Sequence, residues 1–258
     1  MDFKIGSFVC RKSHNEDTVF KIIKIENNVA FLKGVNIRLF ADCKLEDLVV
    51  ANAEEDSFEP TLTKSLDRND YFYLPGKILH IDGDEEYLER CLKFYKKMKV
   101  YAVGKKIEEK DISRQIIPLL EDIKPDIVII TGHDAYYPKK GSKEDLNSYK
   151  NSSNFVKAVT AIRKYEKSHE KLVIIAGACQ SNYEKLIKAG ANFASSPKRI
   201  NIHALDPAII ATSVALSKRN EPIDLVDILE KTKYGPDSIG GIITNGLMYV
   251  GYPRWIQR

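Results

Sequence analysis

The feature that most constrains the fold is a pair of short segments in which every residue is apolar. They are Ile127-Val128-Ile129-Ile130 and Leu172-Val173-Ile174-Ile175. Both are short and rich in β-branched residues, which favours strands over helices. Because successive side chains of a strand point to opposite faces, an unbroken apolar run predicts a strand that is buried on both faces. Such strands are typical of parallel sheets that helices cover on both sides.

The residues around these two runs predict the rest of such a sheet. Apolar residues recur at helical spacing in three segments, and two further short segments have the composition of strands. The helices are expected at residues 84–97, 112–123 and 152–167, and the strands at 77–81 and 100–103. Alternating strands and helices are typical of a doubly wound α/β sheet. We therefore predict a doubly wound parallel α/β domain over residues 76–258.

The first 50 residues predict a separate small β domain. Short apolar or alternating segments at 8–10, 19–25, 29–32 and 35–39 are separated by turn residues. Short strands with tight turns are typical of a compact SH3-like β-barrel. Residues 51–75 are acidic and weakly periodic and end in an aromatic cluster, so they predict a linker.

The composition argues against several classes of protein. The 40 basic residues nearly balance 36 acidic ones, for a net charge of +4, which does not indicate nucleic-acid binding. No apolar run approaches the ~18 residues needed to span a bilayer, and the N-terminal residues do not resemble a signal peptide. We therefore expect a cytoplasmic protein with no membrane and no nucleic-acid partner.

The cysteines are widely spaced, at positions 10, 43, 91 and 179. No two of them form a C-x-x-C pair, so a zinc ribbon is not indicated. In a reducing compartment they are expected to be free thiols. No convincing ligand set for a metal or an organic cofactor is present, and we expect neither.

Reactive side chains follow both apolar runs. The first leads into Thr131-Gly132-His133-Asp134 and the second into Ala176-Gly177-Ala178-Cys179-Gln180. Because sites form beyond the carboxyl ends of parallel strands, neighbouring strands would bring His133 and Cys179 to the same edge. A thiol with a pKa near ~8.5 is mostly protonated at neutral pH, and an imidazole can accept its proton. The pattern predicts Cys179 as nucleophile and His133 as general base.

The residues next to Cys179 extend this hypothesis. Ser181 and Glu184 have the spacing of a capping box, which predicts that a helix begins just after Cys179 and favours the thiolate. The backbone N–H groups of Gly132 and Cys179 are candidates for an oxyanion hole. A buried cysteine with only a packing role is the simpler interpretation.

A second arrangement uses the same cysteine with a different base. Class I amidotransferase-like hydrolases place the nucleophile in a G-x-C-x-G turn. Gly177 fits that pattern, whereas Ser181 replaces its second glycine. The base of that class follows the cysteine in sequence, which nominates His203. A third alternative is a scaffold protein without catalytic activity.

The strand ends and several longer segments resemble known cysteine peptidases. A strand ending in Gly-His and a later strand ending in small residues and Cys resemble the caspase–hemoglobinase clan. Longer segments, among them PDIVIITGHDAYY and IIAGACQSNYEKLIKAGANFASSPKRINIHALDPAIIA, resemble the YabG family of sporulation-specific peptidases. The similar segments cover nearly the whole chain. The resemblance implies a caspase-like fold and a cysteine endopeptidase made in the mother cell of a sporulating bacterium.

The resemblance also implies protein substrates and a preference for cleavage after basic residues. Spore coat and cortex-associated proteins are the expected substrates, with cleavage after Arg or Lys and association with the forming spore coat. A carboxylate would pair with the substrate's cation, and the candidates for it are Asp82, Asp84 and Asp206.

Asp134 either orients His133 or is simply exposed. The basic loop 137–143 is expected to form a flexible wall of the substrate cleft. The third alternative then becomes a non-catalytic scaffold of the spore coat.

Overall fold

A computed structural model describes residues 3–52 and 71–253 of the chain. The chain divides into two compact units, Met1–Glu59 and Pro60–Arg258, and each is described here by itself. Most of the predicted linker, residues 53–70, lies outside the described residues. The boundaries predicted at residues 50 and 75 therefore stay predictions.

The N-terminal unit is a five-stranded antiparallel sheet in the order β4-β3-β2-β1-β5. Its strands are β1 (Phe8–Arg11), β2 (Phe20–Glu26), β3 (Val29–Gly34), β4 (Phe40–Lys44) and β5 (Leu48–Val50). The apolar side chains of one face form its core, among them Val9, Phe20, Ile22, Leu32 and Leu48. The sheet confirms a small antiparallel β unit, while its identification as an SH3-like barrel stays a prediction.

One predicted strand of this unit is wrong. The N–H of Gly34 donates to the carbonyl of Leu39 at 2.7 Å, so residues 35–39 form a connection rather than a strand. The fourth strand begins at Phe40 instead. The fifth strand, β5, was not predicted because it has only three residues and the pairing with β1 defines it.

The larger unit contains a six-stranded sheet in the order β12-β11-β10-β9-β7-β8. Its strands are β7 (Ile78–Asp82), β8 (Ala102–Lys106), β9 (Ile127–Thr131), β10 (Val173–Ala176), β11 (Phe193–Ser195) and β12 (Ile239–Gly241). Every neighbouring pair is parallel except β11 and β12. The mostly parallel sheet is therefore confirmed. The strand expected at 100–103 begins at Ala102, because Val100 still donates to Tyr95 at the end of the preceding helix.

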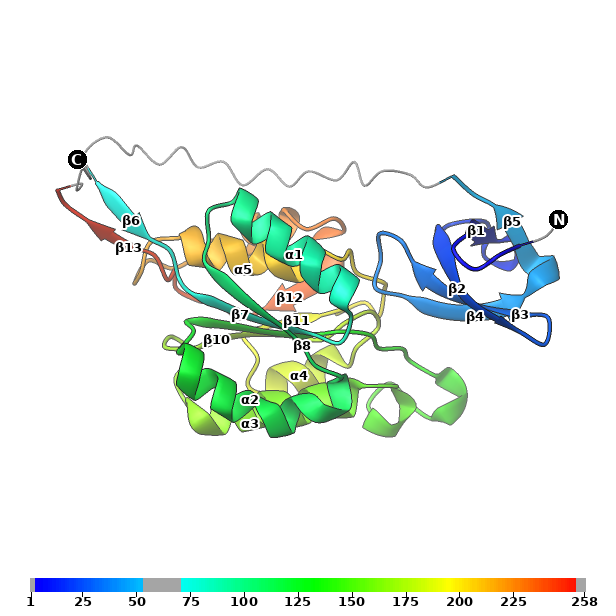
Figure 1. Ribbon diagram of the computed structural model, residues 1–258. Coiled ribbons are helices and arrows are strands. Elements are labelled where there is room, and N and C mark those ends of the chain that lie inside the picture. Colours follow the sequence, from blue (N-terminus) through cyan, green and yellow to red (C-terminus); the bar gives the residue numbers. More distant parts are fainter. Residues whose placement is uncertain (1–2, 53–70, 254–258) are drawn as a thin grey trace. The chain divides into compact units, whose positions relative to one another are not determined.

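Helices cover both faces of this sheet (Figure 1). On one face lie α1 (Glu85–Lys97) and α5 (Asp206–Leu216), and on the other lie α2 (Glu109–Ile123), α3 (Ser152–Tyr165) and α4 (Tyr183–Ala189). This two-sided cover explains the apolar run in β9, where residues 127–130 have no exposed surface. Among the described residues, no helix has the length and apolar character that crossing a membrane requires.

The remaining elements are short. Helix α6 (Leu225–Glu230) precedes β12, and β6 (Phe72–Leu74) pairs with β13 (Tyr249–Gly251) as an antiparallel ribbon. Single 3₁₀ turns lie at Lys12–His14, Leu45–Asp47, Pro138–Lys140, Leu146–Ser148 and Gly235–Asp237.

The order of the strands determines where a site is expected. After β7 the chain adds β8 on one side, and it then adds β9, β10 and β11 on the other side. The direction therefore reverses between β7 and β9, and ligands of open α/β sheets bind beyond the carboxyl ends at such a point. Asp82 ends β7 and Thr131 ends β9, so Asp84 and His133 follow at this edge.

The opposite end of β10 is held by Arg163, which lies in the last turn of α3. Its guanidinium donates at 2.9–3.1 Å to the carbonyls of Glu166, Ser168, Leu172 and Gly190 and to the side chain of Asn192. The same Asn192 oxygen accepts from the N–H of Ile174 in β10. Arg163 therefore joins α3, the end of α4 and the strand that leads to Cys179.

We expect Arg163→Lys to lower the free energy of unfolding by about 2–4 kcal/mol. A lysine keeps the charge but lacks the planar fork of donors, so several part-buried carbonyls lose their partners. Urea denaturation measures the change. The neighbouring exposed Lys164→Gln serves as the control and should change stability by less than about 0.5 kcal/mol. Equal effects of the two substitutions would contradict the role given to Arg163.

Candidate active site

Strands β9 and β10 are neighbours, as the sequence predicted. They pair in parallel, with Ile130 opposite Ala176. Beyond the pair, the N–H of Gly177 donates to the carbonyl of Ile130 at 3.1 Å, and the hydroxyl of Thr131 donates to the carbonyl of Gly177 at 2.9 Å. His133 lies three positions after Ile130, and Cys179 lies three positions after Ala176. The segments that carry them therefore leave the sheet side by side at one edge.

Two further hydrogen bonds join these segments beyond His133 and Cys179. The hydroxyl of Ser181 donates to the carboxylate of Asp134 at 2.8 Å. The N–H of Tyr136 donates to the side-chain oxygen of Gln180 at 3.1 Å. Contacts before and after His133 and Cys179 thus bind one segment to the other. The direct pairing of the two side chains stays a prediction.

The turn that carries Cys179 has two residues in the left-handed region. Gly177 has a φ of +104° and Gln180 a φ of +58°. A side chain at Gly177 would be strained by this backbone conformation, and its Cβ would lie 2.9 Å from a methyl of Leu186. For a non-glycine residue such as Gln180 the left-handed conformation costs about 1–2 kcal/mol. Hydrogen bonds of Gln180 to Ile200 and Asn201 help to offset that cost.

Cys179 is fully buried at this turn. Its sulfur accepts a hydrogen bond from the N–H of Ile202 at 3.3 Å. The N–H of the next residue, Gln180, donates to the carbonyl of Ile200 at 3.1 Å. Residues 200–202 therefore lie against the turn that carries the thiol. None of the four cysteines, all within the described residues, forms a disulfide bond.

The predicted capping box after Cys179 is wrong. Helix α4 begins at Tyr183, and the side chain of Asn182 accepts from the N–H of Lys185 at 3.2 Å as its N-cap. Asparagine is as good an N-cap as serine, so the helix begins one residue later than expected. The Ser181 hydroxyl instead accepts from the N–H of Ala178 at 2.9 Å. Cys179 is therefore not adjacent to the helix terminus, which weakens the expected effect of the helix dipole on the thiol.

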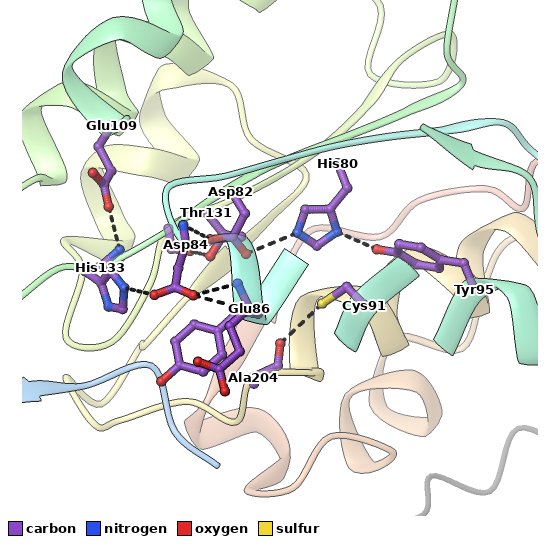
Figure 2. A network of polar contacts seen from close by, with 12 residues as sticks. His80, Asp82, Asp84, Glu86, Cys91, Tyr95, Glu109, Thr131, His133 and Ala204 are labelled. Carbon is purple, nitrogen blue, oxygen red and sulfur yellow. Dashed lines mark hydrogen bonds and ion pairs between the residues drawn. The ribbon is translucent and has the colours of Figure 1, made fainter. Parts of the chain in front are cut away.

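Two carboxylates, those of Asp84 and Glu109, contact His133 (Figure 2). Its Nε2 lies 3.1 Å from Oδ2 of Asp84, and its backbone N–H donates to Oε1 of Glu109 at 2.8 Å. The ring of Tyr87 packs against the imidazole, with the ring centres 5.7 Å apart. Asp84 was predicted to bind a substrate cation, and the structure places it beside His133 instead of on an open surface. That substrate contact itself stays a prediction.

Glu109 was not predicted as a site residue. It is the first residue of α2 and follows β8, whose carboxyl end lies at the same edge of the sheet. That position was the only signal in the sequence, and many first-turn glutamates share it because acidic residues favour helix N-termini. A Cβ at Gly132 would overlap Oε1 of Glu109, so a side chain there would displace this carboxylate from the N–H of His133.

The alternative of an exposed Asp134 is wrong, whereas its role in orienting His133 stays a prediction. The residue is only 3% exposed. It accepts from the N–H groups of Ala135 and Asn151 at 2.9 and 2.7 Å and from the hydroxyls of Ser152 and Ser181 at 2.5 and 2.8 Å. Burial raises the pKa of Asp134, and these hydrogen bonds oppose the rise. Its role is to organise the loops on either side of the candidate site.

The other two predicted substrate carboxylates are fully buried. Oδ1 of Asp82 accepts from the N–H of Asp84 at 2.9 Å, and its Oδ2 lies 3.6 Å from Nε2 of His80. Asp206 accepts from the N–H groups of His203 and Lys233, both at 3.0 Å, and burial raises the pKa of its carboxyl. Both carboxylates therefore already have partners within the chain, and their predicted contact with substrate stays a prediction.

The second candidate base also lies close to this region. His203 is fully buried, and its Nδ1 accepts from the N–H of Leu205 at 3.2 Å. The preceding residue, Ile202, contacts the sulfur of Cys179. The structure therefore brings the segments of both histidines to the cysteine, and geometry alone leaves both as candidates.

The basic loop 137–143 is anchored at its end. The carbonyl of Lys143 accepts from the hydroxyl of Tyr149 and from the side chain of Asn182, both at 2.8 Å. The hydroxyl of Tyr136 donates to the carbonyl of Gly141 at 3.1 Å. The bond from Asn182 links the loop to the turn after Cys179. Its role as a flexible wall stays a prediction.

Comparisons with known proteins agree with the resemblance. The sequence profile of the family described as YabG peptidase U57 matches residues 4–68 and 58–253. The chain is also 42% identical to the sporulation-specific protease YabG of Bacillus subtilis (strain 168), over 98% of this chain and 99% of the relative. Matches of this extent cover both compact units. The chain therefore belongs to the YabG family of peptidases.

Proposed function

We propose that this chain is a cysteine endopeptidase that acts during sporulation, with Cys179 as nucleophile and His133 as general base. The family consists of peptidases, and the relative is sporulation-specific. The observation that carries the proposal is the parallel pairing of β9 and β10, with hydrogen bonds on both sides of His133 and Cys179. This arrangement supports a thiol and an imidazole in one pocket.

The proposed reaction proceeds in two steps. The sulfur of Cys179 attacks the peptide carbonyl carbon while its proton passes to His133, and the imidazolium then protonates the leaving amine. Water hydrolyses the resulting thioester and restores the thiol. The N–H groups of Gly132 and Cys179 are proposed to stabilise the oxyanion. Both groups belong to the two segments that leave the sheet side by side.

Binding of substrate must also uncover the thiol. The N–H of Ile202 now donates to the sulfur, and residues 200–202 cover it. We infer that this segment moves when a peptide enters, so that the substrate carbonyl takes its place next to Cys179. The two hydrogen bonds of Gln180 to Ile200 and Asn201 are the ones that such a shift breaks.

The strand order supports the predicted caspase-like fold. In chain order, β7, β8, β9 and β10 are the first four strands of the sheet. His133 follows the third and Cys179 the fourth, which is the arrangement that the resemblance to the caspase–hemoglobinase clan implies. We propose the same clan for this chain, with an SH3-like N-terminal unit.

The proposed substrates are spore coat and cortex-associated proteins, cleaved after Arg or Lys in the mother cell. This rests on the resemblance and on the sporulation-specific relative. Asp82 and Asp206 remain candidates for the carboxylate that pairs with the substrate cation. Membership in a peptidase family argues against the alternative of a non-catalytic scaffold. The amidotransferase-like arrangement with His203 is the second candidate, favoured by the contact between Ile202 and Cys179.

Cys179→Ala is expected to reduce cleavage of an Arg-containing peptide by about 10⁴-fold or more, because the nucleophile is lost. Cys91→Ala is the matched control: Cys91 is also buried and contacts a carbonyl, that of Ala204, at 3.5 Å. The control should keep activity of the same order as the unmodified chain. Both variants should keep the circular dichroism spectrum of the native protein. Full activity of Cys179→Ala would rule out this cysteine as nucleophile.

Replacement of each histidine distinguishes the two candidate bases. His133→Ala should reduce kcat/KM by about 10²–10⁴-fold, because proton transfer to and from the reacting groups is lost. His203→Ala should leave measurable activity. The measurement is kcat/KM of both variants on one peptide. A larger loss in His203→Ala than in His133→Ala would favour the amidotransferase-like arrangement.

A further inference from the structure

We propose that Asp84 is a positioning residue that fixes the imidazole of His133 and stabilises its cationic form during the reaction. The proposal rests on the function proposed above, and it changes the role predicted for Asp84 from the sequence. It makes the reactive group a triad of Cys179, His133 and Asp84, built on three separate strand ends.

The contact between Asp84 and His133 is close and shielded from water. Oδ2 of Asp84 lies 3.1 Å from Nε2 of His133, and the two side chains are only 10% and 8% exposed. Screening by solvent is weak at such a site, so a charge-assisted hydrogen bond is stronger there than on the surface. The pair lies at the point between β7 and β9 where the strand order reverses direction.

The Asp84 carboxylate has little freedom to rotate (Figure 2). Its Oδ1 caps helix α1, because it accepts from the N–H groups of Glu86 and Tyr87 at 3.0 and 3.2 Å. Its own N–H donates to Asp82 at 2.9 Å. With one oxygen bound to the helix terminus, the other is directed at His133. The same first turn of α1 presents the ring of Tyr87 to the imidazole.

His133 is also fixed through its backbone. Its N–H donates to Glu109 of α2 at 2.8 Å, and the preceding strand β9 is hydrogen-bonded between β7 and β10. The imidazole is therefore held by Asp84 at the ring and by Glu109 at the main chain. Both carboxylates come from the starts of helices at the carboxyl edge of the sheet. This is the preorganisation that proton transfer between fixed groups needs.

In the proposed reaction the two ring nitrogens of His133 have different roles. With the hydrogen on Nε2 donated to Asp84, Nδ1 is the nitrogen that accepts the proton of the Cys179 thiol. The S–H bond breaks, an N–H bond forms on Nδ1, and the imidazole becomes a cation. Asp84 stays ionised and stabilises that cation across the Nε2 contact, as carboxylates do in other triads.

This role differs measurably from that of a substrate-binding carboxylate. A carboxylate that binds the substrate's Arg determines KM and the preference for Arg over neutral side chains. A carboxylate that positions the base acts on the transition state, so its loss lowers kcat and leaves KM and side-chain preference nearly unchanged. Steady-state kinetics with matched Arg and Gln peptides separates the two roles.

The variant that tests the proposal is Asp84→Asn. Asparagine caps helices as well as aspartate does, so α1 keeps its cap while the negative charge is removed. The matched control is Asp224→Asn. Asp224 is exposed and is the N-cap of α6, where its Oδ1 accepts from the N–H of Asp227 at 3.1 Å. We expect kcat of Asp84→Asn to decrease by about 10²–10⁴-fold, with KM and the Arg preference changed by less than about threefold. The control should retain the native kcat.

Stability is measured by thermal denaturation of each variant. If Asp84→Asn does not fold, Asp84→Ser replaces it, because serine is also a good N-cap and carries no charge. A folded neutral variant with native kcat overturns the proposal, and so does one that loses the Arg preference while keeping kcat. Either result leaves the proposed peptidase intact as long as Cys179→Ala is inactive. An active Cys179→Ala overturns the proposed function itself.

Discussion

The burial of β9 and β10 on both faces is the constraint on which the rest of the larger unit depends. Their side chains are 0–1% exposed, with helices on either side of the sheet. Fully burying each such side chain stabilises the fold by roughly 1.5–3 kcal/mol. Because helices α2, α3 and α4 lie on one face and α5 on the other, a shift in the pairing of the two strands would disturb packing on both faces. The core therefore fixes the register, and the register places the segments of His133 and Cys179 side by side.

Carboxylates then determine the shape of the edge that the strands present. Asp134 joins the loop after β9 to the turn after β10, Glu109 holds the backbone of His133, and Asp84 faces its ring. Asp134 and Asp84 each accept at least three hydrogen bonds or contacts with little access to water. A carboxylate bound in this way is rigid, and it transfers that rigidity to the groups it contacts. The same edge also holds a buried thiol, because the N–H of Ile202 donates a hydrogen bond to the sulfur of Cys179. The site thus combines a closely held imidazole with a buried thiol, and these are the proposed base and the proposed nucleophile.

Sequence patterns predicted the parts of the fold that depend on periodicity. The apolar runs predicted β9 and β10, and helical spacing predicted α1, α2 and α3, because two-sided and one-sided burial leave different patterns. Local patterns failed where two residues compete for one role or where an element is very short. Asn182 caps α4 instead of Ser181, residues 35–39 form a connection, and β5 depends on its pairing with β1. The chain's similarity to the YabG family extends over both units and supports the peptidase assignment.

By itself, the sequence determined the alternation of strands and helices, the residue types at the strand ends and the family. Those properties follow from the order of residues along the chain. Only the tertiary structure decided which carboxylates contact His133. It also decided that Asp134 accepts hydrogen bonds from Ser152 and Ser181, and that the N–H of Ile202 contacts the sulfur of Cys179. Asp84 and His133 are 49 positions apart, and Cys179 and Ile202 are 23 apart. Contacts at such separations depend on how strands pair and helices pack, and no local pattern of residues encodes them.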